Sequence, residues 1–323
     1  MTQLVVKSSF SLGWRGSMVN SDDASLLSRE VTLNLVTQRL PKRRGRIKWA
    51  VSAGLVTALV AVLVVAFQAG SEDWRTDCTE FTPVADVVPA LEKARQALLS
   101  VGHEPLLSME IVDLDTCATA VSWKGDLAQP AASVVKLLIV LDLLQRTSTN
   151  SGAVENDVIA MLTRSDDGVA SRLWQEGGGS AIVTRQVKAL NLRNTRPPAA
   201  AGQWGSTVMS AADISTVYRH IAGALEAEDR ELLTSAMAEA PRTAADGFDQ
   251  HFGIPSGLPG ATWAIKQGWG SSGGRRVLNS TGLVKFGGTY AVTLMSSWRQ
   301  DADWATVSAA LTKATNALRS TMR

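Results

Sequence analysis

The chain has 323 residues, enough for one large domain or two small ones, and its 32 Lys and Arg nearly balance its 30 Asp and Glu. Residues 1–48 hold nine Lys or Arg and three Asp or Glu, whereas the remainder holds 23 and 27, so the larger part is mildly acidic. Because the basic cluster adjoins an apolar segment, the composition excludes a nucleic-acid partner.

The apolar segment, residues 49–67, is nineteen residues without a charge. As a helix it is roughly 28 Å long, about the thickness of the hydrocarbon core of a bilayer. The alternative is the core of a cleaved signal peptide. Against it, a long stretch precedes the segment, and Phe67 stands where a cleavage site needs a small residue. The sequence therefore favours one uncleaved transmembrane helix, with the lipid bilayer as the partner of residues 49–67.

Five cations lie immediately before this segment: Lys42, Arg43, Arg44, Arg46 and Lys48. Cationic flanks stay on the cytoplasmic side, so we expect a single-pass protein of the cell membrane with residues 1–48 in the cytoplasm. That tail shows no sustained periodicity and is predicted to be disordered. Residues 71–84 are predicted to be a linker, and residues 85–323 an extracytoplasmic domain.

Two cysteines, Cys78 and Cys117, follow the predicted membrane segment, where an oxidising compartment allows them to pair. Such a bond closes a loop of about 40 residues and stabilises the fold by roughly 4 kcal/mol in the chain-entropy account. The alternative is two separate thiols. The three histidines are scattered and no ligand spacing is present, so neither a metal nor another cofactor is predicted.

The first half of the domain begins with a helix and two strands and continues with helices. The strands are separated by a short polar turn, as in a hairpin. Ser210 and Asp213 have the spacing of a capping box at the start of the last helix. The predicted elements are a helix at Val87–Leu99, strands at Leu106–Leu114 and Thr119–Trp123, a helix at Ser133–Leu144, and helices from Asn156 to about Ala240, including Ala181–Leu190 and Asp213–Leu225.

The last third returns to strands and ends in a helix. The glycine-rich stretch Gly270–Gly274 is predicted to be a flexible hairpin loop. Strands from both ends of the domain flank a helical block, which predicts an α+β fold: one antiparallel sheet flanked by helices, an all-helical lobe, and a cleft between them. The predicted elements are strands at Trp263–Ile265, Val277–Leu278, Gly282–Phe286 and Tyr290–Ser296, and a helix at Trp304–Leu318.

Ser133 and Lys136 form an S-x-x-K pair at the start of a very apolar helix. A spacing of three places both side chains on one helical face. A serine becomes a nucleophile when a neighbour takes its proton, and burial lowers the pKa of a lysine enough for this task. Two further short signals follow in order: Ser165-Asp166-Asp167 between helical segments, and Lys266-Gln267-Gly268 after a strand.

The ordered set resembles the penicillin-recognising serine hydrolases, the superfamily of serine β-lactamases and D,D-peptidases, whose motifs are S-x-x-K, S-D-N or S-x-N, and K-T-G. The resemblance covers roughly residues 85–320 and implies a β-lactamase/transpeptidase-like fold. SDDGVASRLW, which begins at Ser165, looks like the helix that opens at S-D-N in class A β-lactamases. Trp204-Gly205-Ser206-Thr207 looks like the segment that closes their omega loop.

The resemblance also implies a role for each matching residue. Ser133 would be the acylated nucleophile, Lys136 its proton acceptor, and Ser165 the proton relay to the leaving nitrogen. Lys266 would hold the carboxylate of a substrate. The backbone N–H groups of Ser133 and Trp269 would form the oxyanion hole, while Gln267 and Gly268 would line the edge strand beside the substrate.

Three departures bear on activity. Asp167 stands where the superfamily has asparagine, and an anion beside Lys136 raises its pKa and weakens it as a base. Gln267 replaces the threonine of K-T-G, although its amide retains donors for a substrate. The residues between Thr195 and Trp204 contain no Glu or Asp, whereas class A β-lactamases deacylate with a glutamate there.

These observations predict a membrane-anchored serine hydrolase that forms an acyl-enzyme at Ser133 with cell-wall peptide or a β-lactam. The missing omega-loop glutamate favours a D,D-peptidase-like catalyst. The alternative is a catalytically silent member that binds an envelope ligand or partner protein in the same cleft, as Asp167 indicates. The third hypothesis is a weak β-lactamase.

Overall fold

The computed structural model describes Trp74 and residues 87–102, 105–147 and 152–322. The predicted tail, membrane segment and linker lie outside the described residues, apart from Trp74. Within the described part, no helix is both long and apolar enough to cross a bilayer.

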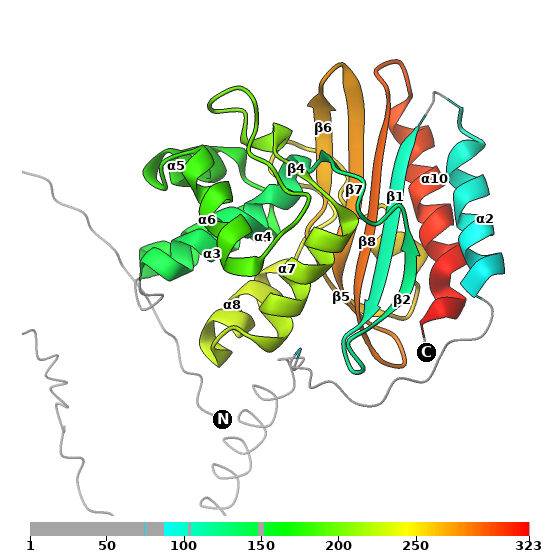
Figure 1. The fold of residues 1–323 in the computed structure, drawn as a ribbon, viewed down its shortest axis with the longest axis horizontal. Helices are drawn as coiled ribbons and strands as arrows, with labels where there is room; N and C mark the ends of the chain where they lie inside the picture. The colour runs from blue at the N-terminus through cyan, green and yellow to red at the C-terminus, as the bar shows by residue number, and fades with distance from the viewer. Residues whose placement is uncertain (1–73, 75–86, 103–104, 148–151, 323) are drawn as a thin grey trace, which may run out of the picture. The chain divides into compact units, whose positions relative to one another are not determined.

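One antiparallel sheet forms the centre of the domain (Figure 1). The strand order is β2-β1-β8-β7-β5, and β6 also pairs with β7, so β5 and β6 together form one edge. This places strands from both ends of the domain in one sheet, as predicted. The strands are β1 (Leu106–Asp113), β2 (Ala118–Trp123), β5 (Thr262–Ile265), β6 (Gly268–Ser272), β7 (Arg275–Lys285) and β8 (Thr289–Arg299), while β3 (Gln129–Pro130) and β4 (Val208–Met209) pair separately.

The helices form two groups. Figure 1 shows the first and last helices of the described domain, α2 and α10, side by side, with the other long helices across the sheet from them. The predicted helix at Val87–Leu99 is confirmed over the residues that the structure describes, and it ends at Leu99 as predicted. The helices are α2 (Val87–Leu99), α3 (Lys136–Arg146), α4 (Gly152–Thr163), α5 (Asp167–Glu176), α6 (Ser180–Leu190), α7 (Ala211–Gly223), α8 (Ala227–Ala238), α9 (Ile254–Gly257) and α10 (Trp304–Ala317), with short 3₁₀ turns at Ala132–Val135, Trp204–Ser206 and Leu318–Thr321.

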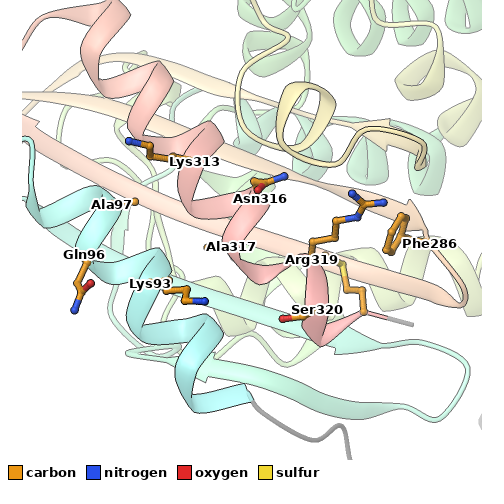
Figure 2. Close-up of a pocket in the computed structure, with 10 residues that line it drawn as sticks. Lys93, Gln96, Ala97, Phe286, Lys313, Asn316, Ala317, Arg319 and Ser320 are labelled. Carbon is orange, nitrogen blue, oxygen red and sulfur yellow. The ribbon is translucent and has the colours of Figure 1, made fainter.

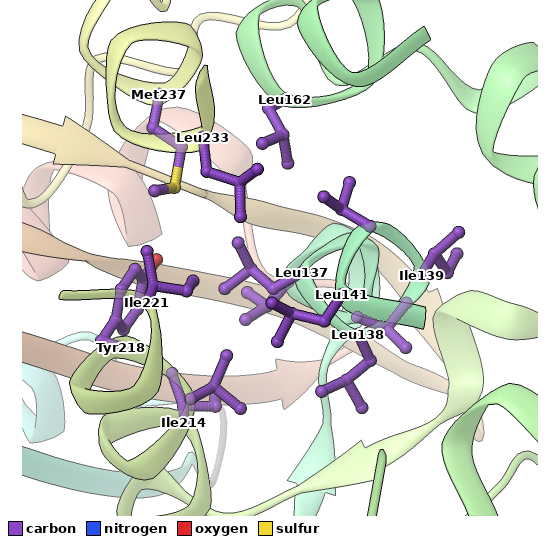
Figure 3. Close-up of a cluster of buried hydrophobic side chains, with 14 of the residues drawn as sticks. Leu137, Leu138, Ile139, Leu141, Leu162, Ile214, Tyr218, Ile221, Leu233 and Met237 are labelled. Carbon is purple, nitrogen blue, oxygen red and sulfur yellow. The ribbon is translucent and has the colours of Figure 1, made fainter. Parts of the chain in front are cut away.

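Two hydrophobic cores lie on the two faces of the sheet. Along β8, Val292 and Leu294 belong to the core with α2 and α10, while Ala291 and Met295 belong to the core with the helical lobe. This alternation is the period of two expected for a strand covered on both faces. Figure 3 shows the second core, where leucines of α3 meet side chains of α4, α7 and α8.

The predicted strand pair at Val277–Leu278 and Gly282–Phe286 is wrong in one respect, because both belong to the single strand β7. Asn279, Ser280 and Thr281 misled the prediction because they are polar. All three are fully buried, and their side chains hydrogen-bond neighbouring segments inside the domain.

The predicted flexible loop at Gly270–Gly274 is also mostly strand. Gly268–Ser272 forms β6, which pairs with β7. Only Gly273 and Gly274 make the turn, and both have positive φ (58° and 71°). Two central residues with positive φ fit the type I′ hairpin turn, where glycine is strongly preferred. The edge of the sheet is thus a regular hairpin.

The predicted hairpin of the first two strands is confirmed, with Met109 opposite Trp123 and Asp113 opposite Ala118. The Asp113 carboxylate accepts hydrogen bonds from the backbone of the turn. Cys117 lies in this turn and is disulfide-bonded, which excludes the alternative of a free thiol there. The other cysteine of the chain, Cys78, lies outside the described residues.

The capping box predicted at α7 is only half formed. The Ser210 side chain accepts from the Asp213 N–H, as expected for an N-cap. The Asp213 carboxylate instead accepts from the backbone N–H groups of Arg193 and Asn194 and from the Thr195 hydroxyl, at 2.7–2.9 Å. Asp213 therefore fixes the start of the segment that leads to the predicted omega loop.

Replacing Asp213 by alanine removes three hydrogen bonds to a buried carboxylate. We expect Asp213→Ala to lower the free energy of unfolding by about 2–4 kcal/mol, measured by urea denaturation followed by tryptophan fluorescence. Glu231→Ala, at an exposed position of α8, is the control and should change stability by less than about 0.5 kcal/mol. Equal stabilities of the two variants would show that Asp213 does not anchor the segment.

Candidate active site

Ser133 lies in the 3₁₀ turn Ala132–Val135, which leads directly into α3. The predicted helix from Ser133 thus begins as an α-helix only at Lys136. Ser133 is 5% exposed, and its hydroxyl makes no hydrogen bond to another described residue. It borders a cavity of about 430 Å³. The cavity is lined by Ala132, Ser133, Asp167, Gly202, Gln203, Trp204, Gly205, Ser206, Asp246, Trp269, Gly270, Ser271, Ser272 and Val277.

The turn that carries Ser133 is fixed to the sheet edge. Asn279 of β7 donates from Nδ2 to the carbonyl oxygens of Pro130 and Ala131, at 3.0 and 3.1 Å. A Cβ at Gly268 would lie 2.5 Å from the Ala131 oxygen, so only glycine permits this approach. Gly268, a predicted site residue, thus allows the turn that carries Ser133 to lie against β6.

Lys136 is fully buried, and its donors are taken up by Ser165 and Asp167. Its Nζ donates to the Ser165 carbonyl oxygen at 2.7 Å, to Ser165 Oγ at 3.0 Å and to Asp167 Oδ1 at 2.5 Å. An ammonium has three donors, so this set is complete. In this arrangement an ammonium at Lys136 has all its donors taken up, and it would have to lose a proton before it could accept one.

Two opposing effects act on the pKa of Lys136. Burial lowers the pKa and is the largest cause, while the charge of Asp167 and its hydrogen bond raise it. The net direction is downward. Asp167 therefore opposes deprotonation, as predicted from the sequence, but burial outweighs it.

Ser165 connects the two lysines of the site. Its Oγ accepts from Lys136 Nζ at 3.0 Å and from Lys266 Nζ at 2.9 Å. Its φ of 57° is unusual for a residue other than glycine, and it turns the chain between α4 and α5. The following residue, Asp166, is the N-cap of α5. The three motifs found in the sequence thus meet at one hydroxyl.

Lys266 is 1% exposed, and Thr281 of β7 and Tyr218 of α7 hold its backbone in place. Thr281 Oγ1 donates to its carbonyl oxygen, and the Tyr218 hydroxyl lies 2.8 Å from Thr281 Oγ1. Burial, followed by the charge of Lys136, holds the pKa of Lys266 well below its usual value. A lysine whose pKa is lowered in this way gives up its proton more readily, as a proton-transfer group requires.

Gln267 does not present its amide to the cavity, contrary to our expectation. Its Nε2 donates to the carbonyl oxygens of Gln250 and Phe252, at 3.1 and 2.7 Å, and its Oε1 accepts from the Thr281 N–H. The side chain is 1% exposed, so its donors are taken up inside the domain. Because Gln267 replaces the threonine of K-T-G, the site lacks a side-chain donor at this position.

Two residues that the motifs did not reveal also line the cavity. The ring of Trp204 has Lys136 Nζ 4.9 Å from its centroid, and its Nε1 donates to Ser171. Asp246 accepts from Trp269 Nε1 at 2.8 Å. Trp204 belongs to a segment that the sequence already matched to the superfamily. Asp246 lies in a loop without any motif, and only folding brings Asp246 to the site.

The segment matched to the omega loop contributes only uncharged residues to the lining of the described cavity. Arg196 pairs with Val208 through two backbone hydrogen bonds, and Gly202 and Gln203 reach the cavity. The segment contains no carboxylate.

A larger cavity, about 980 Å³, lies far from these motifs. Figure 2 shows it between α2 and α10, with the exposed cations Lys93, Lys313 and Arg319 around it. Its lining contains no serine or lysine of the three motifs. The smaller cavity beside Ser133 is therefore the candidate active site.

No protein-family model matches the chain. Curated relatives from Mycobacterium bovis and Mycobacterium tuberculosis H37Rv bear the name "Putative lipoprotein LppW". They are 36% identical to the chain over 191 residues, which is 57% of this chain and 60% of the relative. The match thus spans about three fifths of the length of these relatives.

Solved structures resemble the chain over most of its described part. A β-lactamase from Chitinophaga pinensis has a TM-score of 0.60 at 14% identity, covering 71% of this chain and 97% of its own. A mutant of PBP-A in an acyl-enzyme complex with penicillin G has a TM-score of 0.58 at 21% identity, covering 74% and 98%. A class A β-lactamase from Mycobacterium abscessus has a TM-score of 0.58 at 17% identity, covering 71% and 97%. The described part of the chain therefore has the α+β fold of class A β-lactamases and PBP-A.

Proposed function

We propose that this protein is a serine hydrolase of the penicillin-recognising type that forms an acyl-enzyme at Ser133. The observation that carries the proposal is the contact of three separate motifs: Ser165 Oγ accepts from both Lys136 and Lys266, within 3.0 Å, beside a cavity that Ser133 lines. The solved PBP-A complex, an acyl-enzyme with penicillin G, supports the same chemistry on this fold.

The reaction needs one proton acceptor and one relay. Ser133 Oγ attacks the carbonyl carbon of an amide or β-lactam, and its proton passes to neutral Lys136 Nζ. The tetrahedral oxyanion would be stabilised by the backbone N–H groups of Ser133 and Trp269. The C–N bond then breaks, and the leaving nitrogen receives a proton through Ser165. Water later hydrolyses the ester and restores Ser133.

The fold supports a small ligand in this cavity. Cell-wall peptide or a β-lactam would bind as the small ligand beside Ser133. Because no carboxylate lies in the segment matched to the omega loop, deacylation should be slow, which favours a D,D-peptidase-like role over an efficient β-lactamase. The name of the mycobacterial relatives supports an envelope location. We extend this to a single-pass anchor at residues 49–67 with the catalytic domain outside the membrane.

A catalytically silent binding protein is the second candidate. The 2.5 Å contact between Lys136 and Asp167 favours it, because the lysine is held as a cation. In that case the cavity would bind an envelope ligand or partner without reacting.

One experiment separates these functions. The purified full-length chain is incubated with a reporter penicillin, and the intact mass is followed with time. A stable adduct on the native chain that disappears in Ser133→Ala is the expected result. Ser151→Ala, at a serine outside the three motifs, is the control and should retain the adduct. A folded native chain that never gains mass or turns over the penicillin would overturn the catalytic proposal.

A further inference from the structure

The larger cavity, between α2 and α10, carries positive charge only. Lys93, Lys313 and Arg319 line it and are all exposed, whereas no Asp or Glu of the described residues lines it (Figure 2). None of the three forms an ion pair with another described residue. Glu92, which precedes Lys93 in the chain, pairs with Arg95 on the same helix. Three cations without a neutralising partner in the described chain favour an anionic ligand.

The rest of the lining suits a ligand that also carries hydrocarbon. Gln96 and Ser320 add uncharged polar groups to the cavity, while Phe286 and Met322 add apolar surface. The guanidinium of Arg319 lies over the Phe286 ring, with its Cζ 4.7 Å from the ring centroid. A cation is thus held beside an apolar wall, as the headgroup and first carbons of a phospholipid require.

Trp74 connects this part of the domain to the predicted membrane segment. Lys285 Nζ, at the end of β7, lies 5.0 Å from the centroid of the Trp74 ring, which is buried in the core of the helical lobe. Phe286, the next residue, lines the cavity. Trp74 follows Phe67, the last residue of the predicted segment, by seven positions, which span at most about 25 Å. In the proposed topology the cavity is therefore tethered close to the membrane surface.

The elements around the cavity present one end of the domain to the membrane. Figure 1 shows the start of α2 and the end of α10 at the same end of the sheet as the turn between β7 and β8. Val88, in the first turn of α2, is 76% exposed, more than any other large hydrophobic side chain of the described residues. An apolar side chain beside cations can enter the lipid interface.

We propose that the cavity between α2 and α10 binds the phosphate-bearing headgroup of an anionic phospholipid, and that this contact seats the domain against the bilayer. Its three cations bind the phosphate, and Phe286 contacts the adjoining hydrocarbon. The inference goes beyond the proposed reaction and does not depend on acylation. It rests on the proposed function only for the anchor at residues 49–67, which selects a lipid over a soluble anion.

The test compares vesicles that differ in headgroup charge. The full-length chain is placed in vesicles of phosphatidylcholine, or of phosphatidylcholine mixed with phosphatidylglycerol. A membrane-impermeant reagent acetylates exposed amines, and peptide mass spectrometry gives the rate at each lysine. We expect Lys93 and Lys313 to react about tenfold more slowly on the anionic vesicles, and this protection to shrink at high salt. Lys188, exposed on α6, is the internal control and should react equally on both.

Arg319→Gln should remove most of the protection, because it takes one cation from the cavity and leaves both reporter lysines in place. An anionic membrane also repels an anionic reagent, but that repulsion does not depend on Arg319. Arg219→Gln is the matched control, because Arg219 is an exposed arginine of α7 that does not line the cavity. It should leave the protection unchanged, and urea denaturation checks that both variants are folded.

Equal rates on the two kinds of vesicle, or protection that survives Arg319→Gln in the folded chain, would overturn this inference. Inorganic phosphate added to phosphatidylcholine vesicles should protect little, and protection as strong as that from phosphatidylglycerol would overturn the lipid as the ligand. If both lysines are protected but penicillin never modifies the native chain, the inference stands and the proposed catalytic function fails.

Discussion

Asp167→Asn should accelerate acylation of Ser133 by penicillin by about tenfold at pH 7. The Asp167 carboxylate raises the pKa of Lys136 through its charge and its hydrogen bond, against the larger lowering by burial. Removing the charge lets the pKa fall further, so a larger fraction of Lys136 is neutral. The gain stays at about tenfold because Asp167 is 65% exposed, so solvent screens much of its charge.

The pH dependence of acylation tests the effect of Asp167 on Lys136 in a second way. In the native chain the rate should rise with pH, because Lys136 accepts the serine proton only after it loses its own. In Asp167→Asn the rising limb should move to lower pH, and the two rates should converge at high pH, where Lys136 is neutral in both. Rates are measured by intact mass over a pH series.

Asp166→Asn is the matched control for this variant. Its charge also raises the pKa of Lys136, but as a lesser cause, and asparagine preserves the N-cap of α5. Its effect on acylation should be much smaller. An unmoved pH profile in folded Asp167→Asn would show that the ion pair does not restrain Lys136. If the native chain is silent, a reactive Asp167→Asn would identify this one contact as the cause.

The sequence predicted the parts of the fold that depend on local periodicity. The helix Val87–Leu99 and the first hairpin lie where predicted, and in the helix the residues at helical spacing Ala90, Ala94 and Leu98 are buried, whereas Val88 is exposed. Polar residues with distant partners caused the errors. Asn279 and Thr281 looked like a break between strands, yet they bond the turn before Ser133 and the strand end at Lys266. No local pattern predicts partners more than a hundred residues away, such as Ala131 for Asn279.

The site, like the fold, was predicted from the sequence only in part. Ser133, Lys136, Ser165 and Lys266 belong to ordered short motifs, and the hydrogen bonds of Ser165 bring the last three together as expected. The side-chain direction of Gln267 was not predictable, because it depends on carbonyl groups of the chain near Gln250. Asp246 reaches the cavity only through the folding of a loop without a motif.

Lys266→Met should separate catalysis from stability. Lys266 Nζ donates to Ser165 Oγ at 2.9 Å and to the Gln267 carbonyl oxygen at 3.1 Å, so its loss leaves the proposed relay without one partner. General acid–base groups contribute about a hundredfold or more, and we expect acylation to fall by at least that factor. Lys313→Met, at an exposed site on α10, is the control and should retain full activity.

Stability should move in the opposite direction in Lys266→Met. The pKa of Lys266 in the folded state is well below its usual value, so the folded chain binds this proton less readily than the unfolded chain. The native protein therefore loses stability as the pH falls through the folded pKa, and methionine removes that loss. We expect Lys266→Met to be more stable by about 1 kcal/mol or more at pH 6, with the difference shrinking above pH 10. Urea denaturation at a series of pH values measures the difference in stability between the two chains. A Lys266→Met variant that is less stable than the native chain at pH 6 would contradict a lowered pKa of the buried Lys266 amine.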